Sequence, residues 1–311
     1  MRRFLAILVL LTFAILSVVG EEIVLSTPTG NIHGKITVPQ DGIPCPIVIL
    51  IAGSGPTDMD GNTIGTEYRN NSLLYLAQEL AGRGIATLRY DKRGIGLSAD
   101  AGTREEDLRF EHYIDDAVAW ADTLSKDSRF TKIAIAGHSE GSLVGMIASN
   151  RSSHVKAYIS IAGCGSPAYT IIEEQLNKQS PALKELAEKI NSRLRQGEVV
   201  EDVPQYLESL YRKSVQPYLM SWFRYDPAQE IAKLKIPVLI LQGDKDIQVS
   251  TQESQKLFMA RMFSSYYIIK DMNHVLKHCE YDNMLMQLET YKDPSHPIKS
   301  ELIERISSFI K

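Results

Sequence analysis

The chain has 311 residues, of which 44% are hydrophobic and 23% are charged, and its formal net charge is −4. A chain of this length and composition can bury a full core as one domain, which we predict over residues 21–311. The balanced charge lacks the basic face that nucleic-acid binding requires, so no nucleic-acid partner is expected.

Residues 1–20 differ from the rest of the chain. Arg2 and Arg3 precede an apolar stretch over 4–19, which is the order of charge and hydropathy found in secretory signal peptides. We expect cleavage before Glu21 and a secreted or periplasmic mature protein without a stable membrane partner. The alternative is an uncleaved membrane anchor, although the stretch falls just short of the roughly 18–20 apolar residues that a spanning helix needs.

Apolar runs of strand length alternate with helical patterns along most of the chain. Helices are expected over 72–80, with Asn71 or Ser72 as the cap, and over 106–125. Edge strands are expected over 23–25 and 32–38. Central strands are expected over 47–52, 85–90, 132–136 and 157–161. Such alternation predicts an α/β fold with a mostly parallel sheet covered by helices on both faces.

The alternation stops between about 166 and 230, where the chain becomes helical, charged and aromatic. We interpret this stretch as a helical lid inserted over the active site, because insertions at such loops leave the core strands intact and often select substrates. Aromatic residues recur there at roughly helical spacing: Tyr211, Tyr218, Trp222 and Tyr225. They either pack the lid onto the body, which we favour, or line an acyl or aryl pocket, with Tyr218 and Trp222 as candidate substrate contacts.

A candidate nucleophile follows the apolar run 133–136. The sequence Gly-His-Ser-Glu-Gly over 137–141 leads from that run into a helical segment over 142–150. A G-x-S-x-G turn between a strand and a helix lifts its serine into a tight elbow, where small residues are needed because the backbones crowd. Ser139 is therefore the predicted nucleophile.

Candidate partners follow in the order serine, acid, histidine that this arrangement uses. Asp244 and Asp246 come after the buried run 236–241, and His274 comes after the next run. All lie where parallel strands place their active sites. Histidine takes the serine proton near neutral pH, and a carboxylate holds the imidazole in one tautomer. His278 is the rival base, but His274 lies in the strand-exit loop and is preferred.

Two backbone amides are predicted to hold the developing oxyanion. One is the N–H of Glu140, directly after the nucleophile. The other is the N–H of Ser54, since the apolar run 46–52 leads straight into a glycine-rich loop in which Gly53 allows close approach. Fixed donors of this kind are each worth about 10²–10³ in rate.

These residues together resemble the α/β-hydrolase superfamily of serine hydrolases, in the bacterial secreted branch of esterases and serine aminopeptidase-like acyl hydrolases. The family pattern places the acid three residues after a glycine, which selects Asp246 over Asp244, and its usual oxyanion-loop His-Gly is Ala52-Gly53 here. The resemblance implies cleavage of ester, thioester or amide bonds through a covalent acyl-enzyme. It covers nearly all of the chain after residue 21 and rests on the segments 53–58, 90–98, 137–141, 243–246 and 273–274.

Other motifs are interpreted structurally. The segment 58–62 resembles the start of a calcium loop, but its glycine comes too early and the loop lacks the closing glutamate. The segment 91–94 follows a predicted strand near the site. It either touches substrate or, as we favour, shapes a loop in which Arg93 pairs with an acid and glycines allow tight turns. Cys45 and Cys164 adjoin apolar runs and are expected to be small core residues, and no C-x-x-C pair suggests zinc. The sequence predicts neither a metal site nor a cofactor.

Three functions are compatible with these residues. We favour a carboxylesterase acting on small or aromatic acyl esters, with a serine aminopeptidase-like peptidase as the alternative. Lid carboxylates could hold a substrate ammonium, but such charges usually form a solvated helix face. A non-catalytic binding protein on the same scaffold has no need of a nucleophile, an acid, a base and an oxyanion loop together. A small-molecule ester or peptide is the expected partner, and the sequence does not specify the oligomeric state.

Overall fold

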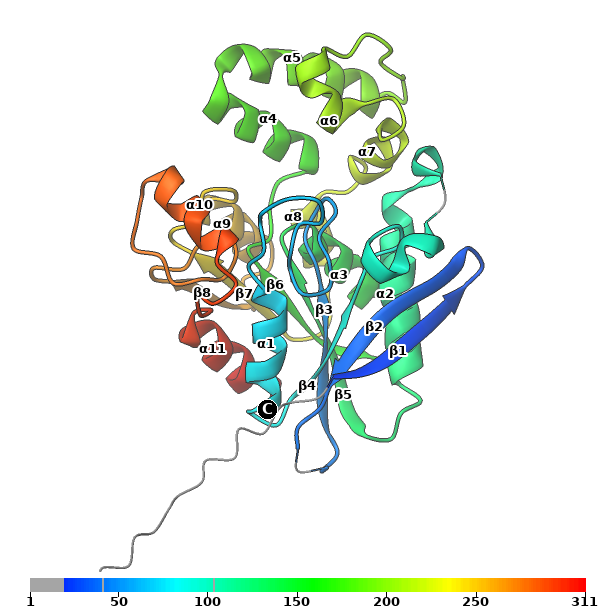
Figure 1. Cartoon of the computed structure of the whole chain (residues 1–311), viewed down its shortest axis with the longest axis vertical. Coiled ribbons are helices and arrows are strands. Elements are labelled where there is room, and N and C mark those ends of the chain that lie inside the picture. Colours follow the sequence, from blue (N-terminus) through cyan, green and yellow to red (C-terminus); the bar gives the residue numbers. More distant parts are fainter. Residues whose placement is uncertain (1–19, 41, 103) are drawn as a thin grey trace, which may run out of the picture.

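The computed structural model describes residues 20–40, 42–102 and 104–311. These residues form one mixed sheet with helices packed around it (Figure 1). Its eight strands follow the order β1-β2-β4-β3-β5-β6-β7-β8. The strands from β4 to β8 in this order are parallel, whereas β2 pairs antiparallel with β1 and β4. Their bounds are β1 Gly20–Thr27, β2 Gly30–Thr37, β3 Cys45–Ile51, β4 Ala86–Tyr90, β5 Phe130–His138, β6 Val155–Ile161, β7 Val238–Gly243 and β8 Ser265–Ile269.

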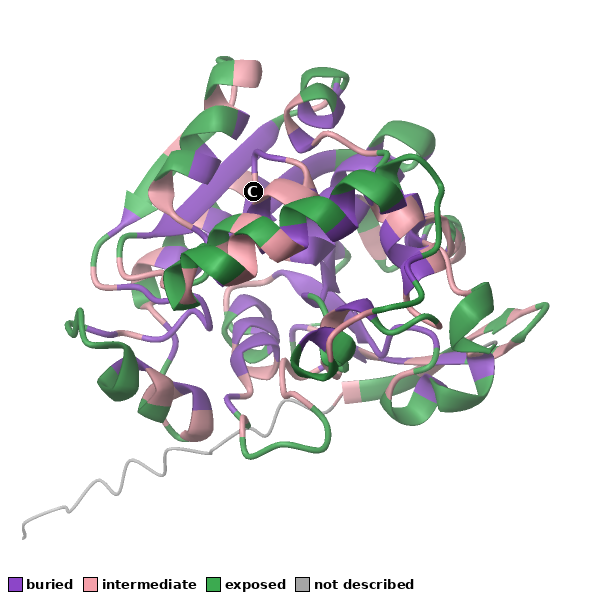
Figure 2. Cartoon of the chain, turned by 90° about the horizontal axis from the view of Figure 1, so that it is seen from above, coloured by how far each residue is buried: buried purple, intermediate pink, exposed green. Residues whose placement is uncertain are grey.

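Helices cover both faces of the sheet, as predicted. The apolar side chains of α1 (Ser72–Ala81) and α11 (Ser300–Ile310) belong to one core cluster, and those of α2 (Phe110–Leu124), α3 (Glu140–Arg151) and α9 (Thr251–Ala260) belong to the other. Figure 2 shows the buried strands beneath helices whose outer sides are exposed. The α/β prediction is confirmed.

The central strand β3 explains why the core has two halves. Ile47, Ile49 and Ile51 belong to the cluster that contains α2 and α3, and the intervening Val48 and Leu50 belong to the cluster that contains α1 and α11. Successive side chains of a strand point to opposite faces, so a continuous apolar run is what a doubly covered strand requires.

A helical insertion over residues 166–230 separates β6 from β7, and its helices from α4 (Ala168–Gln179) to α7 (Gln216–Trp222) lie above the body in Figure 1. A lid role for this insertion stays a prediction at this point. In the part of the chain that the structure describes, no helix has both the length and the apolarity to cross a membrane. The remaining helices are α4 Ala168–Gln179, α5 Pro181–Arg195, α6 Glu208–Tyr211, α7 Gln216–Trp222, α8 Pro227–Ala232 and α10 Met284–Lys292, with 3₁₀ turns η1 Gly96–Ala101, η2 Glu105–Asp107 and η3 Gln205–Leu207.

Some local predictions need correction. The run 32–38, expected at a sheet edge, corresponds to β2, which pairs on both sides, so the edges are β1 and β8. The helix expected over 106–125 begins at Phe110 because the two residues before it have extended backbone. Asn71 occupies the cap position of α1, but its side chain makes no cap and its amide oxygen accepts a hydrogen bond from Asn62. The predicted signal segment lies outside the described residues, apart from its last residue, which begins β1.

Candidate active site

The predicted nucleophile lies at a sharp turn between β5 and α3. Ser139 has φ 55° and ψ −121°, a left-handed conformation that side chains rarely adopt. A Cβ at Gly137 would lie 2.0 Å from the carbonyl oxygen of Gly141, and one at Gly141 would lie 2.4 Å from that of Ile51. Both positions therefore need glycine, which is the physical reason for the spacing in the motif.

The predicted acid and base meet through a buried hydrogen bond. His274 Nδ1 lies 2.7 Å from Asp246 Oδ2, with the two side chains 5% and 1% exposed. Burial opposes ionisation of Asp246, but His274 and the N–H groups of Val249 and Gln248 outweigh it and lower the pKa of the carboxyl. Because a carboxylate only accepts, Nδ1 carries the proton and Nε2 is left to face away from Asp246.

The rival residues are held elsewhere. The Asp244 carboxylate accepts the N–H of Asp271 at 2.6 Å and is exposed. The His278 ring lies 3.3 Å from Glu280 and is about half exposed. Of the two acids and two histidines that the sequence offers at these loops, only Asp246 and His274 are brought together.

His138 contacts the predicted base, an arrangement that sequence reasoning missed. Its Nε2 lies 2.8 Å from the carbonyl oxygen of His274, and the ring centroids of the two histidines are 4.8 Å apart. A carbonyl oxygen only accepts, so Nε2 of His138 carries the proton. Burial, followed by the neighbouring His274, lowers the pKa of His138 to about 3. His138 directly precedes Ser139, so these contacts join His274 to the residue next to the predicted nucleophile. No hydrogen bond of the Ser139 hydroxyl occurs among the described residues; such bonds are often long without substrate.

The two predicted oxyanion donors flank the nucleophile. A Cβ at Gly53 would lie 3.2 Å from Ser139 Cβ, so this loop passes directly beside the elbow. Ser54 and Glu140 both line the same cavity as Ser139. Glu140 is the first residue of α3, so its N–H has no partner within the helix and is available to an anion.

A buried ion pair lies behind these donors. Lys92 Nζ is 3.0 Å from Glu140 Oε2 and 2.6 Å from the carbonyl oxygen of Gly53. Glu140 also accepts a 2.5 Å hydrogen bond from the hydroxyl of Tyr218. The predicted pairing of Arg93 with an acid, in the loop after β4, is confirmed. Arg93 binds the carboxylate of Asp116. Nothing in the local sequence signals the contacts of Lys92.

The nucleophile opens into a cavity of about 670 Å³ between the body and the helical insertion. Its apolar wall includes Leu143 from α3 together with residues of the insertion. Cys164 also lines it, instead of packing in the core as predicted. The insertion contributes Ser166, Ala168, Ile171, Ile172, Gln175, Ser209, Leu210, Arg212, Val215, Tyr218, Leu219, Trp222 and Pro227.

The aromatic residues of the insertion pack within it or on the body, and two of them also line the cavity. Trp222 stacks on Phe110 of α2 with ring centroids 5.8 Å apart, and Tyr225 packs on the same ring. Tyr211 is buried inside the insertion and donates its hydroxyl proton to an asparagine of α5. Tyr218 and Trp222 line the cavity as well as packing on the body. Tyr218 and Trp222 therefore both line the cavity and pack the insertion against α2.

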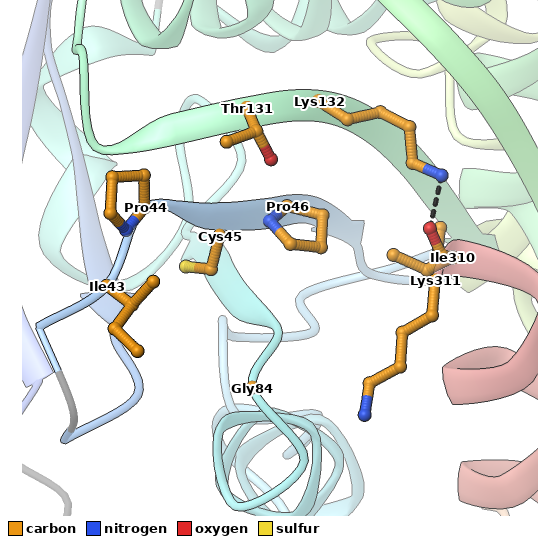
Figure 3. Close-up of a pocket in the computed structure, with 9 residues that line it drawn as sticks. All are labelled: Ile43, Pro44, Cys45, Pro46, Gly84, Thr131, Lys132, Ile310 and Lys311. Carbon is orange, nitrogen blue, oxygen red and sulfur yellow. Dashed lines mark hydrogen bonds between the residues drawn. The ribbon is translucent and has the colours of Figure 1, made fainter.

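A second cavity, of about 460 Å³, lies at the opposite end of the sheet (Figure 3). Cys45, which is buried, and Pro46 line it at the start of β3, and Lys132 of β5 donates to the carbonyl oxygen of Ile310 beside it. Its lining holds no histidine and no carboxylate side chain. The chemistry therefore gathers at the carboxyl ends of the strands, as expected for a parallel sheet.

Among the described residues, no group of three or more His, Cys, Asp or Glu side chains is arranged to hold a metal ion. In the calcium-like segment, the Asp58 carboxylate accepts the N–H groups of Asp60 and Asn62 at 2.9 and 2.8 Å. This carboxylate shapes its own loop.

Comparison with known proteins identifies a family that matches this chain and a relative of similar sequence. The family described as Serine aminopeptidase, S33, matches residues 69–277, which include the elbow, Asp246 and His274. The chain belongs to this family. This S33-family chain is 29% identical to esterase EstD of Thermotoga maritima over 260 residues. The aligned region covers 79% of this chain and 58% of EstD. The chain thus spans little more than half of that relative.

Solved structures share the fold of this S33-family chain. Est1E from Butyrivibrio proteoclasticus is 21% identical with a TM-score of 0.58, over 92% of this chain and 99% of that one. The Pyrococcus furiosus esterase Pf2001 is 16% identical with a TM-score of 0.59, over 95% and 92%. At these identities the similarity establishes the α/β-hydrolase fold alone.

Proposed function

We propose that this protein is a serine hydrolase that cleaves carboxylic esters through a covalent acyl-enzyme. The observation that carries the proposal is the buried hydrogen bond between His274 and Asp246, set beside the elbow that holds Ser139. A nucleophile in a strained turn, a base with its proton fixed on Nδ1 and a buried carboxylate together meet the requirements of acyl transfer.

The reaction follows from these positions. Ser139 Oγ attacks the ester carbonyl carbon while His274 Nε2 takes the hydroxyl proton, and Asp246 stabilises the imidazolium. The N–H groups of Ser54 and Glu140 hold the oxyanion of the tetrahedral intermediate. Its collapse breaks the bond to the alkoxy oxygen, which leaves as an alcohol with the proton from His274. Water then repeats the sequence on the acyl-enzyme and releases the carboxylic acid.

The cavity supports an ester with an apolar or aromatic acyl group as substrate. Leu143, Ile171, Tyr218 and Trp222 provide an apolar and aromatic wall. The similarity to an esterase, EstD, points in the same direction.

Peptide hydrolysis is the second candidate, since the family description names serine aminopeptidases. An aminopeptidase needs a carboxylate for the substrate ammonium. Two acidic residues occur in the cavity lining, and both are already paired: Glu140 with Lys92 and Glu105 with Arg212. The absence of an unpaired carboxylate in this lining favours esters.

We also propose that the helical insertion acts as a lid and that residues 1–20 direct export. The insertion supplies much of the cavity wall, so its movement would gate access to Ser139. Sequencing the amino terminus of the protein from cell fractions tests export. A mature protein beginning near residue 21 outside the cytoplasm supports it, and an intact amino terminus in the membrane fraction supports the anchor.

The function is tested by hydrolysis of short-chain and aryl p-nitrophenyl esters beside aminoacyl p-nitroanilides. The variants are Ser139→Ala and, as a control, Ser149→Ala on the helix that follows it, α3. The buried hydroxyl of Ser149 has no hydrogen-bond partner among the described residues. Ester turnover should be lost in the first variant and kept in the second. Release from the anilides alone would assign a peptidase. Failure of both substrate classes, with fluorophosphonate labelling as weak as in Ser139→Ala, would assign a binding protein.

A further inference from the structure

Lys92 is a buried charge that contacts both sides of the oxyanion site. It follows β4, and its ammonium touches the carboxylate of Glu140 at 3.0 Å and the carbonyl oxygen of Gly53 at 2.6 Å. The side chains of Lys92 and Glu140 are 2% and 3% exposed. The ammonium also lies 4.9 Å from the ring centroid of Tyr113. These contacts are made inside the protein, where Lys92 also lines the cavity that contains Ser139.

The contact with Gly53 acts on the next residue through the peptide plane. The peptide bond is planar and trans, so the carbonyl of Gly53 and the N–H of Ser54 point in opposite directions. A cation that holds the carbonyl oxygen on one side therefore fixes the direction of the N–H on the other. It also polarises the peptide group, which strengthens that N–H as a donor.

The contact with Glu140 acts on the second donor. Its carboxylate is held between Lys92 and the hydroxyl of Tyr218, which anchors the residue whose backbone N–H begins α3. The two donors come from loops that are far apart in sequence, and Lys92 hydrogen-bonds to one residue in each loop, through the carbonyl oxygen of Gly53 and the carboxylate of Glu140. One ammonium thus links their positions.

We propose that Lys92 is a positioning residue that aligns both oxyanion donors, an inference that rests on the acyl-transfer function proposed above. Stability alone does not account for the pair, because a buried ion pair is often no more stabilising than apolar residues of the same volume. Alignment does account for it, since oxyanion donors act only when they are held in the geometry of the transition state.

The neighbouring residue provides a matched comparison. Arg93 forms a similarly buried ion pair with Asp116, with side chains 8% and 4% exposed. This pair contacts neither Gly53 nor Glu140, and neither of its residues lines the cavity. Its removal should cost stability without disturbing the donors.

The test compares Lys92→Met, the double variant Lys92→Met/Glu140→Gln and the control Arg93→Met/Asp116→Asn. The single variant leaves a carboxylate buried without its cation, so the double variant guards against failure to fold. Measurements are thermal melting, kcat and KM for an ester that wild type hydrolyses in a Ser139-dependent way, and the affinity of an alkyl boronic acid, which forms a tetrahedral adduct on the serine.

We expect kcat of the folded Lys92 variants to fall about 10–100-fold, and KM to stay within about threefold of wild type. The loss in kcat is smaller than the effect of about 10²–10³-fold on removing an oxyanion donor, because the donors are misaligned but still present. Boronate affinity should fall by the same factor as kcat/KM. The control should melt earlier but keep kcat within about threefold. Unchanged kcat in a folded Lys92 variant, or equal losses in both ion-pair variants, would overturn the positioning role. If wild type shows no Ser139-dependent turnover, the hydrolase proposal fails, and this role fails with it.

Discussion

Replacing His138 by glutamine should make the fold less sensitive to mild acid. In the native protein the His138 ring is partly buried, donates Nε2–H to the carbonyl of His274 and packs against the ring of that residue. Protonation of its Nδ1 would place a buried positive charge beside the ring of His274. Glutamine is neutral at every pH, and its amide N–H can donate to the same carbonyl.

The magnitude follows from the two states of the histidine. Its pKa is about 3 in the folded protein and about 6.5 in an unfolded chain. Below about pH 6.5 the unfolded chain takes up a proton that the folded chain does not, so the free energy of unfolding falls as the pH drops toward 3. Between pH 7 and pH 5 the loss from this residue is about 1–2 kcal/mol, after allowance for partial exposure of the ring.

Urea unfolding of wild type and His138→Gln at pH 7 and pH 5 measures this loss directly. The difference between the two pH values should be about 1–2 kcal/mol smaller in the variant, whatever its stability at pH 7. His154→Gln is the control, since it removes a histidine whose side chain is 48% exposed and should leave most of the loss in place. An equal loss in wild type and His138→Gln would refute the reasoning.

Two further substitutions test the site. Asp246→Asn should lower kcat by about 10⁴ with little change in KM, because an amide does not hold His274 in the required tautomer; wild-type KM with undiminished kcat would remove Asp246 from the triad. The pKa of this carboxyl is lowered in the fold. The ionised carboxylate therefore stabilises the protein above about pH 3.9, and this stability is lost as the pH falls through the lower pKa of the folded protein. Acid unfolding of the Asp246→Asn variant should lack this loss. Gly53→Ala should lower kcat at least about tenfold, because its Cβ would lie 3.2 Å from Ser139 Cβ. Gly82→Ala, where the nearest atom is at 3.5 Å, should retain activity; equal kcat in both alanine variants would contradict the close approach.

Local sequence predicted much of the fold and the candidate site. The doubly covered strand β3 is visible as an uninterrupted apolar run, because each of its faces meets a core cluster. The elbow is visible because Gly137 and Gly141 have no room for a side chain. His274 was chosen over His278 from its place directly after a strand, and the preference for Asp246 came from the family pattern.

The contacts of His138 and Lys92 were beyond local reasoning. His138 meets His274 across 136 residues of chain, and Lys92 meets Glu140 across 48. Periodicity and turn chemistry act over a few residues, whereas these contacts depend on which strand ends the sheet order brings together.

The sequence by itself determined the alternation of elements, the glycine-bounded turn and the residue types available at the strand ends, because steric crowding and burial act on each segment where it stands. Only the tertiary structure decided which of those residues face one another: that Asp246 rather than Asp244 binds His274, and that one buried lysine contacts both Gly53 and Glu140. The direction of a side chain at a strand end is set by the packing of the elements around it, and that packing exists only in the folded chain.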